Sequence, residues 1–230
     1  MKILAFKLKW KFWHFRRFYT TTSPLTFSFP PFTVIRGLIW AILWKEKDSY
    51  NEEFAKIKLG VEIVNPVEKT MIWLNLTNTK TWSWYTQVRQ ETLLNPEYII
   101  YVWDENFNEY EKLKQNLEKK ESVYTPYLGL AMFIADIYYI WEEEWILQEV
   151  ENVNIDSIVP IEYTNNGKNI KIKENQNLEF EKVPYFMDNE RNLKKLQEFV
   201  FDTAWTKNNG RVKLKKVKIF NNFNKKIILI

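Results

Sequence analysis

Residues 32–44 read FTVIRGLIWAILW, and apolar side chains recur through this stretch at the spacing of an α-helix. One helix face would carry Val34, Leu38 and Ile42. The face beside it would carry the residues that follow them, Ile35, Ile39 and Leu43. Two prolines, at positions 30 and 31, prevent an earlier helix start, and Thr33 can serve as the N-cap. Because both apolar faces need cover, we expect a buried helix that ends near Trp44.

β-prone runs lie on both sides of this helix. A first strand at residues 3–8 precedes it, and strands at 61–64, 98–103 and 137–140 follow, with a second helix that starts at Asp104. The order βαββαβ predicts an α+β fold of the ferredoxin-like (RRM-like) type. Two further β-prone runs within residues 71–89, around a Thr/Asn/Lys tip, predict an inserted hairpin.

The remaining sequence suggests two regions. We assign residues 1–145 to the ferredoxin-like domain, with the hairpin at about 68–94, and residues 146–230 to a smaller β-rich C-terminal region. Short β-prone pieces between Asn-rich turns dominate the second region. Periodicity also predicts a helix at 189–198 there, and a short helix at 130–135 in the first region.

Charge is unevenly distributed along the 230 residues. Up to Lys45 the chain holds eight Lys/Arg and no acid, and residues 203–230 again hold eight Lys/Arg and no acid. The middle, 46–202, carries 17 basic and 29 acidic residues, although the net charge of the whole chain is only +4. Cationic ends around an anionic middle suggest one nucleic-acid face and a different surface for proteins.

Composition excludes several classes of chemistry. The chain has no cysteine and one histidine, which rules out disulfides, thiol catalysis and multi-histidine metal sites. We expect no cofactor and no metal. The longest uninterrupted apolar run, Leu38–Trp44, is too short to span a bilayer, and the N-terminus lacks the pattern of a secretory signal. A soluble, cytoplasmic protein is the expectation.

The acid-free block contains the stretch KWKFWHFRRFYTTTS, residues 9–23. Interleaved cations and rings suit RNA, because rings stack on unpaired bases and cations neutralise phosphates. The candidate RNA-binding residues are Lys11, His14, Arg16, Arg17, Tyr19, Thr20, Thr21, Ser23 and Arg36. The alternative for this block is a basic surface loop whose rings turn inward, and Arg36 could equally pair with a carboxylate.

The inserted hairpin supplies a second set of candidates. Trp82 and Trp84 fall on the same strand face, so they could hold a base or pack on a neighbouring subunit. The hairpin residues that we expect to contact RNA or a partner are Trp82, Trp84, Tyr85, Gln87 and Arg89. Closure of the hairpin onto the core is an equally good interpretation of the tryptophans.

Four motifs in this order resemble one known family. They are SFPPFTVIRGLIWAIL at 28–43, VEIVNP at 61–66, QVRQETLLNPEYIIYV at 87–102 and YTPYLGL at 124–130. Over residues 1–140 they are similar to the Cas-five family of CRISPR-associated proteins, in the RAMP superfamily, and closest to its type I-B branch. One departure is the lack of a glycine-rich loop late in the chain, where only Gly167 and Gly210 remain.

The resemblance implies a non-catalytic subunit of a type I surveillance complex (Cascade) for antiviral defence. It implies a ferredoxin-like domain with a hairpin thumb that binds the 5′ handle of the guide crRNA and caps the Cas-seven backbone. The Cas-eight large subunit is a further implied partner, and target DNA would be met indirectly or through the thumb. The alternative is a metal-independent endoribonuclease that processes repeat RNA, for which His14 is the one imidazole available.

Overall fold

The computed structural model describes residues 1–20, 23–43, 54–77, 85–105, 109–165, 167–172, 176–203, 211–222 and 224–230. Within them, most of the regular structure is β-sheet and two segments are α-helical, which confirms the predicted α+β class. The elements are β1 (Lys2–Lys9), β2 (Phe12–Trp13), α1 (Phe32–Leu43), η1 (Phe54–Lys56), β3 (Lys58–Ile63), β4 (Lys69–Thr77), β5 (Tyr85–Leu94), β6 (Glu97–Trp103), α3 (Tyr110–Lys119), β7 (Asp136–Glu144), β8 (Ile146–Ile155), β9 (Val159–Pro160), η2 (Ile161–Thr164), β10 (Ile170–Lys171), β11 (Leu178–Met187), β12 (Leu193–Asp202), β13 (Val212–Asn221) and β14 (Lys226–Ile227).

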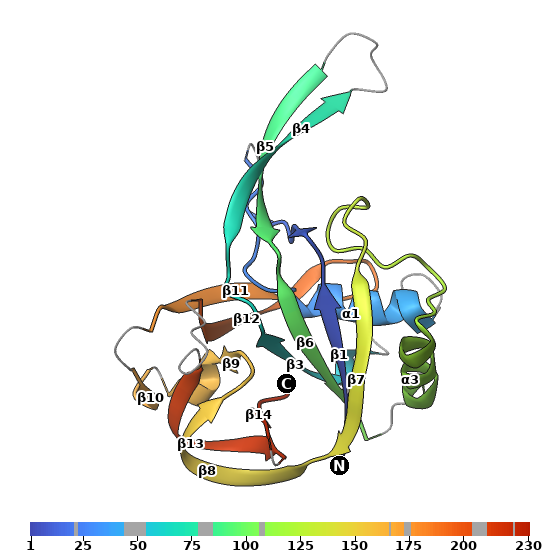
Figure 1. Cartoon of the computed structure of the whole chain (residues 1–230). Helices are drawn as coiled ribbons and strands as arrows, with labels where there is room; N and C mark the ends of the chain where they lie inside the picture. The colour runs from blue at the N-terminus through green and yellow to red at the C-terminus, as the bar shows by residue number, and fades with distance from the viewer. Residues whose placement is uncertain are drawn as a thin grey trace.

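A four-stranded antiparallel sheet in the order β3-β6-β1-β7 forms the centre of the molecule (Figure 1). Along β1, Leu4, Phe6 and Leu8 face the core that contains α1 and α3. Ile3 and Ala5 face a different core on the other side of the sheet. Both faces of β1 are therefore covered, which explains why its sequence is an almost continuous apolar run.

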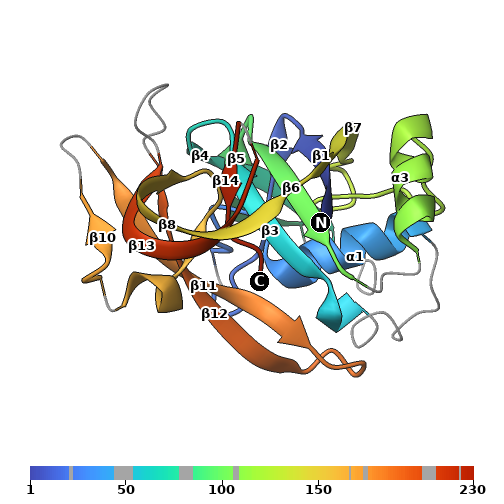
Figure 2. The ribbon, with the colours of Figure 1, turned by 90° about the horizontal axis from the view of Figure 1, so that it is seen from below.

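The C-terminal strands cover that other side. Trp145, Phe220, Ile227 and Leu229 pack there with Tyr101 of β6. β8 pairs with β13, which also carries β10 and β14, while β11, β12 and β9 form a separate three-stranded sheet (Figure 2).

Residues from both predicted regions share one core. Phe29 makes edge-to-face contacts with Phe199 and Phe201 of β12, and Phe32 stacks on Phe199 with ring centroids 5.1 Å apart. The start of α1 is therefore held by a strand that lies more than 150 residues later in the chain.

The predicted hairpin is present. β4 and β5 pair antiparallel from Lys69↔Leu93 to Thr77↔Tyr85, and β2 joins β5 at Leu93. The paired strands rise away from the rest of the molecule (Figure 1). The tip, residues 78–84, lies outside the described residues.

Three local predictions were wrong. α1 begins at Phe32, and the N–H groups of Val34 and Ile35 both bond the Pro31 carbonyl, so Thr33 lies in the first turn and is not the cap. Residues 130–135 form turns and bends, because the backbone there folds back to bond its own loop. The segment 189–198 lies largely in strand β12, since pairing with β11 and burial of its apolar end outweigh the helix propensity of its Leu, Lys and Gln residues.

No helix in the described part of the chain is both long and apolar enough to cross a membrane.

Candidate nucleic-acid interface

A groove of about 560 Å³ lies where β1 ends and β6 begins, beneath the hairpin. Its volume falls within the range of about 300–1,000 Å³ that is common for ligand sites. The lining residues are Lys9, Trp10, Lys11, Asn65, Asn95, Pro96, Glu97 and Asp136. The groove thus takes its cations and its ring from the beginning of the basic–aromatic block.

The turn between β5 and β6 shapes this groove. Asn95 adopts a left-handed conformation with φ of 46°, which asparagine tolerates better than most residues, and Pro96 then leads into β6. The Asn95 N–H donates to the Lys11 carbonyl at 2.9 Å, and the Asn65 amide donates to the Asn95 carbonyl at 3.0 Å. These bonds hold Lys11 in place beside the sheet.

Both acids that line the groove have a partner in the structure, a lysine for Glu97 and a neutral hydroxyl for Asp136. Glu97 pairs with Lys7 at 2.6 Å, and Asp136 accepts the Tyr138 hydroxyl at 2.7 Å. Within the described residues no ion pair involves Lys9 or Lys11. Their ammonium groups lie over rings instead, 4.7 Å from the centroid of Tyr138 for Lys9 and 5.5 Å from that of Phe12 for Lys11. Such cations are available to an anionic ligand.

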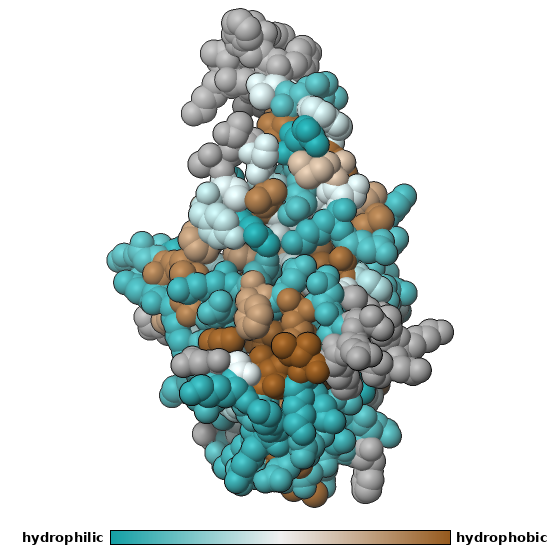
Figure 3. Space-filling model, turned by 90° about the vertical axis from the view of Figure 1, so that its left-hand side faces the viewer, coloured by the Kyte–Doolittle hydropathy of each residue, from teal (hydrophilic) through white to brown (hydrophobic). Residues whose placement is uncertain are grey.

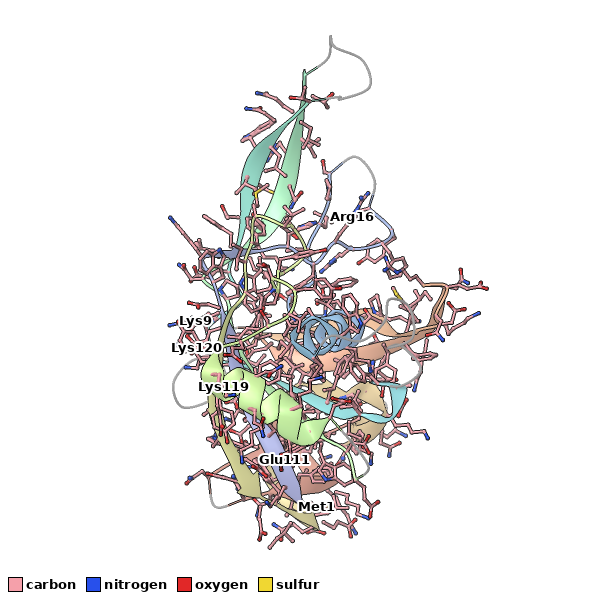
Figure 4. The ribbon with its side chains drawn as sticks, turned by 90° about the vertical axis from the view of Figure 1, so that its right-hand side faces the viewer. Met1, Lys9, Arg16, Glu111, Lys119 and Lys120 are labelled. Carbon is pink, nitrogen blue, oxygen red and sulfur yellow. The ribbon has the colours of Figure 1, made fainter. Side chains whose placement is uncertain are left out.

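Lys120 places a further cation beside the groove. It follows the last residue of α3 in a left-handed conformation, and its ammonium group also lies 4.7 Å from the centroid of Tyr138. Figure 4 shows Lys9, Lys119 and Lys120 together on one side of the molecule, with Arg16 closer to the hairpin. The sequence reasoning missed Lys9, Trp10 and Lys120. The Lys-Trp-Lys run at 9–11 could have indicated the first two, whereas only the fold brings Lys120 to them.

Four of the predicted RNA-binding residues are exposed. Lys11 lines the groove, and Arg16, Tyr19 and Ser23 lie on the loop that follows β2. Arg16 is exposed and donates to the Thr20 carbonyl at 3.2 Å. Thr21, another candidate, lies outside the described residues.

Arg17 and Thr20 have partners inside the protein. Arg17 forms an ion pair with the buried Glu181 of β11, and its Nε donates to the Thr26 carbonyl at 3.1 Å. The Thr20 hydroxyl donates to the Arg17 carbonyl at 2.8 Å. Glu181 also accepts the Ser28 N–H at 2.8 Å, so this set of bonds anchors the loop to β11.

His14 and Arg36 are buried, which corrects their placement on an RNA surface. His14 is 3 % exposed, and its Nδ1 lies 2.7 Å from the Glu91 carbonyl; burial lowers the pKa of this imidazole. Arg36 is 2 % exposed and donates to the backbone carbonyls of Phe54 and Tyr185, and it forms no ion pair with a carboxylate of the described residues. Burial likewise lowers the pKa of Arg36.

The rings of the basic–aromatic block are divided between core and surface. Trp13 and Phe15 are buried, in agreement with the alternative in which rings turn inward. Trp10, Phe18 and Tyr19 are 40 %, 53 % and 58 % exposed, so three rings remain available for stacking.

On the hairpin, Gln87 and Arg89 are exposed, as expected for contact residues. Arg89 lies over the ring of Trp73, which is 62 % exposed and was not among the candidates. Trp82 and Trp84 lie outside the described residues, and only the backbone of Tyr85 is described, paired with Thr77. Among the described side chains no group of three His, Asp or Glu residues could hold a metal ion.

No protein-family model matches this sequence, and no curated protein is similar to it. Solved structures are similar to it in fold. A chain of a "CRISPR RNA-guided surveillance complex" matches with a TM-score of 0.55 and 11 % identity, over 92 % of this chain and 91 % of that one. A CRISPR protein from Archaeoglobus fulgidus matches with a TM-score of 0.57 and 14 % identity, over 99 % and 98 %.

A chain of the Type III-B Cmr-beta complex bound to cognate target RNA and AMPPnP matches with a TM-score of 0.56 and 9 % identity, over 93 % of this chain and 86 % of that one. At these identities the likeness concerns the fold, and it extends over nearly the whole length of the chains. The structural likeness to CRISPR-associated proteins agrees with the resemblance that the sequence motifs indicated: this chain shares its fold with these three chains.

Proposed function

We propose that this chain is an RNA-binding, non-catalytic subunit of a type I CRISPR interference complex in the cytoplasm. In this proposal it takes the Cas-five position, binds the 5′ handle of the guide crRNA, and caps the Cas-seven backbone with the β4–β5 hairpin as a thumb. The Cas-eight large subunit would be a neighbour. The fold likeness and the motif order at residues 28–130 support this assignment.

The sheet also supports the ferredoxin-like assignment. Its four strands and two helices follow the order β1-α1-β3-β6-α3-β7, and the sheet order β3-β6-β1-β7 places the first strand between the third and the fourth. This is the split βαβ arrangement, in which one sheet face carries helices and the other is free for ligands or partners. Here the C-terminal strands cover part of that face.

The groove at the end of β1 is the observation on which the RNA proposal rests. It combines an exposed tryptophan with two cations that form no ion pair among the described residues, and the side-chain amides of Asn65 and Asn95 add hydrogen-bonding groups. A phosphate can bind the ammonium groups while a base stacks on Trp10. The exposed Arg16 and Tyr19 nearer the hairpin would continue the path.

The burial of His14 supports a binding role over the repeat-processing alternative. A general base must reach the 2′-hydroxyl that it deprotonates, and this imidazole faces a backbone carbonyl inside the protein. The processing hypothesis is tested by incubation of the purified protein with repeat RNA in EDTA. Site-specific cleavage that disappears in His14→Asn would contradict the non-catalytic proposal.

Replacement of both groove lysines tests the RNA site. Lys9→Gln/Lys11→Gln should weaken binding of a fluorescently labelled repeat RNA in an anisotropy titration. The slope of log K against log salt should fall by about 1.4, because each single-strand phosphate contact contributes about 0.7.

The matched control is Lys168→Gln/Lys171→Gln, which removes two exposed lysines from the C-terminal region at and before β10. This control should bind RNA like the wild type. If the groove variant also kept the wild-type affinity and salt slope, the groove would not be the RNA site.

A further inference from the structure

In the described part of the chain, the outer edge of β4 carries no further strand. β4 is the last strand of the sheet β2-β5-β4, in which β5 lies between β4 and β2. Within the described residues, no backbone hydrogen bond joins Lys69–Thr77 to any strand other than β5.

The register identifies which backbone groups point outward. The Leu94 N–H donates to the Glu68 carbonyl, so 68/94 is a hydrogen-bonded pair of the antiparallel ladder. Such pairs recur at every second residue. The backbone N–H and C=O groups that bond β5 are therefore those of Thr70, Ile72, Leu74 and Leu76. The N–H and C=O groups of positions 69, 71, 73, 75 and 77 therefore face away from it.

Bonds on the opposite side of β5 agree with this assignment. The N–H groups of Glu91 and Asn95 donate to Pro24 and Lys11, away from β4. Glu91 lies opposite Met71 in the register, so Met71 has its backbone groups on the far edge of the hairpin.

This edge lacks the usual protection of edge strands. Residues 70–77, TMIWLNLT, contain no charge and no proline, and the β4–β5 register runs without a bulge. Met71, Trp73 and Leu76 are 37 %, 62 % and 50 % exposed. Figure 3 shows apolar side chains among polar ones on the hairpin above the body. Edge strands that stay single normally carry lysines, prolines or bulges, which prevent pairing with another chain.

We propose that β4 pairs with β4 of a second copy of this chain. Two identical strands can pair antiparallel about a two-fold axis, so that each copy offers the same outward N–H and C=O groups. Between Thr70 and Thr77 no like charges would face each other, because no charge is present. The pairing turns two projecting two-stranded hairpins into one four-stranded sheet, and sheets of three or more strands are far more stable than an isolated hairpin.

This interface does not involve the groove proposed for RNA. It uses the hairpin that the proposed thumb contact also needs, so the dimer is a state of the chain outside the complex. The groove lysines lie on and after β1, so Lys9→Gln/Lys11→Gln should leave the dimer intact even if it abolishes RNA binding. Failure of one proposal is therefore distinguishable from failure of the other.

Sedimentation velocity on the RNA-free full chain tests the pairing, up to about 100 µM, a concentration at which exposed edges associate. The wild type should dimerise reversibly. Met71→Pro and Asn75→Pro each remove an outward N–H from both copies, and should raise the dimer dissociation constant roughly tenfold or more. Their own hairpins should survive, because these N–H groups do not bond β5.

Met71→Ala and Asn75→Ala are the matched controls, since they shorten the same side chains and keep the N–H groups. They should dimerise nearly as the wild type does. A wild type that stays monomeric over this range would overturn the proposal, and so would proline and alanine variants of equal affinity. If circular dichroism shows that a proline variant is misfolded, Asn75→Lys is used in its place. The lysines that it adds to both copies should dissociate the dimer. A dimer of unchanged affinity would overturn the proposal.

Discussion

Gly129 shows how one residue positions the loop above the basic–aromatic block. Its φ is +89°, and a methyl carbon in place of its hydrogen would lie 1.5 Å from the His14 carbonyl oxygen. The neighbouring Leu128 is fully buried, and its carbonyl accepts the His14 N–H. A residue with a side chain cannot fit here unless the backbone moves.

Gly129→Ala should therefore lower the free energy of unfolding by about 3 kcal/mol or more, because a backbone clash adds to the cost of the left-handed conformation. Gly167→Ala is the matched control, with a φ of +82° and no atom within 4 Å of the added carbon. It should cost only about 1 kcal/mol. Urea denaturation of both variants measures the difference, and equal costs would contradict the close approach.

His14 should make stability depend on pH near neutrality. Burial lowers its pKa below the ordinary value of about 6.5, so below that pH the unfolded chain takes up a proton that the folded chain does not. The free energy of unfolding should therefore fall as pH decreases from about 7.5 to 6, and should level off below the folded-state pKa.

The comparison variant is His14→Asn, whose amide can still donate to the Glu91 carbonyl but does not titrate. Chemical denaturation at each pH should give a flatter profile for this variant. Buried Glu181 and Asp156, whose pKa values burial raises, are common to both proteins and cancel in the comparison. Identical profiles would show that folding does not shift the pKa of His14, which would contradict this prediction.

At the scale of elements, the spacing of apolar residues predicted helices and strands correctly where a single periodicity dominated the segment. The helix in residues 32–44, the first strand and the hairpin all carry a clear spacing of apolar residues, and the structure contains each of them. The segment 189–198 failed because helix-favouring residues precede the buried Phe199–Phe201, and the pairing of β12 with β11 fixes the whole segment as a strand.

Exposure along the elements was harder to predict than the elements themselves. The sequence indicated that positions 9–23 are basic and aromatic, but Trp13 and Phe15 point into the core while Trp10 and Tyr19 do not. Arg36 of α1 is a second example. The sequence suggested a phosphate contact for its guanidinium, but in the structure the guanidinium donates to two backbone carbonyls from distant segments.

For the whole molecule, two buried carboxylates and their partly exposed cations join the central sheet to the C-terminal strands. Lys225 forms an ion pair with Glu62 of β3, which is 2 % exposed and accepts the Tyr101 hydroxyl at 2.5 Å. Asp156 lies 3.9 Å from the same lysine and pairs with Arg211 at 2.5 Å. The cations of the acid-free C-terminal block are thus partly structural.

Lys225→Met should lower the free energy of unfolding by about 3 kcal/mol, because it leaves the buried Glu62 carboxylate without its cation. The double variant Lys225→Met/Glu62→Gln should recover part of this loss. Lys216→Met is the control, since Lys216 pairs with the exposed Glu149 at 3.4 Å and should contribute less than about 1 kcal/mol. Denaturation at pH 7 measures all three, and a double variant no more stable than Lys225→Met would contradict the coupling.

The sequence by itself determined the fold class, the buried helix, the inserted hairpin, the uneven charge and the motifs that resemble one family. These properties depend on local spacing and composition, which a linear pattern records. Only the tertiary structure decided which of the clustered cations and rings reach solvent, and it brought Lys120 of α3 to the Tyr138 ring beside Lys9. The physical reason is that burial and ion pairing depend on neighbours from distant segments. Arg17 forms an ion pair with Glu181, and Lys225 forms one with Glu62. Lys9 and Lys11 form no ion pair among the described residues.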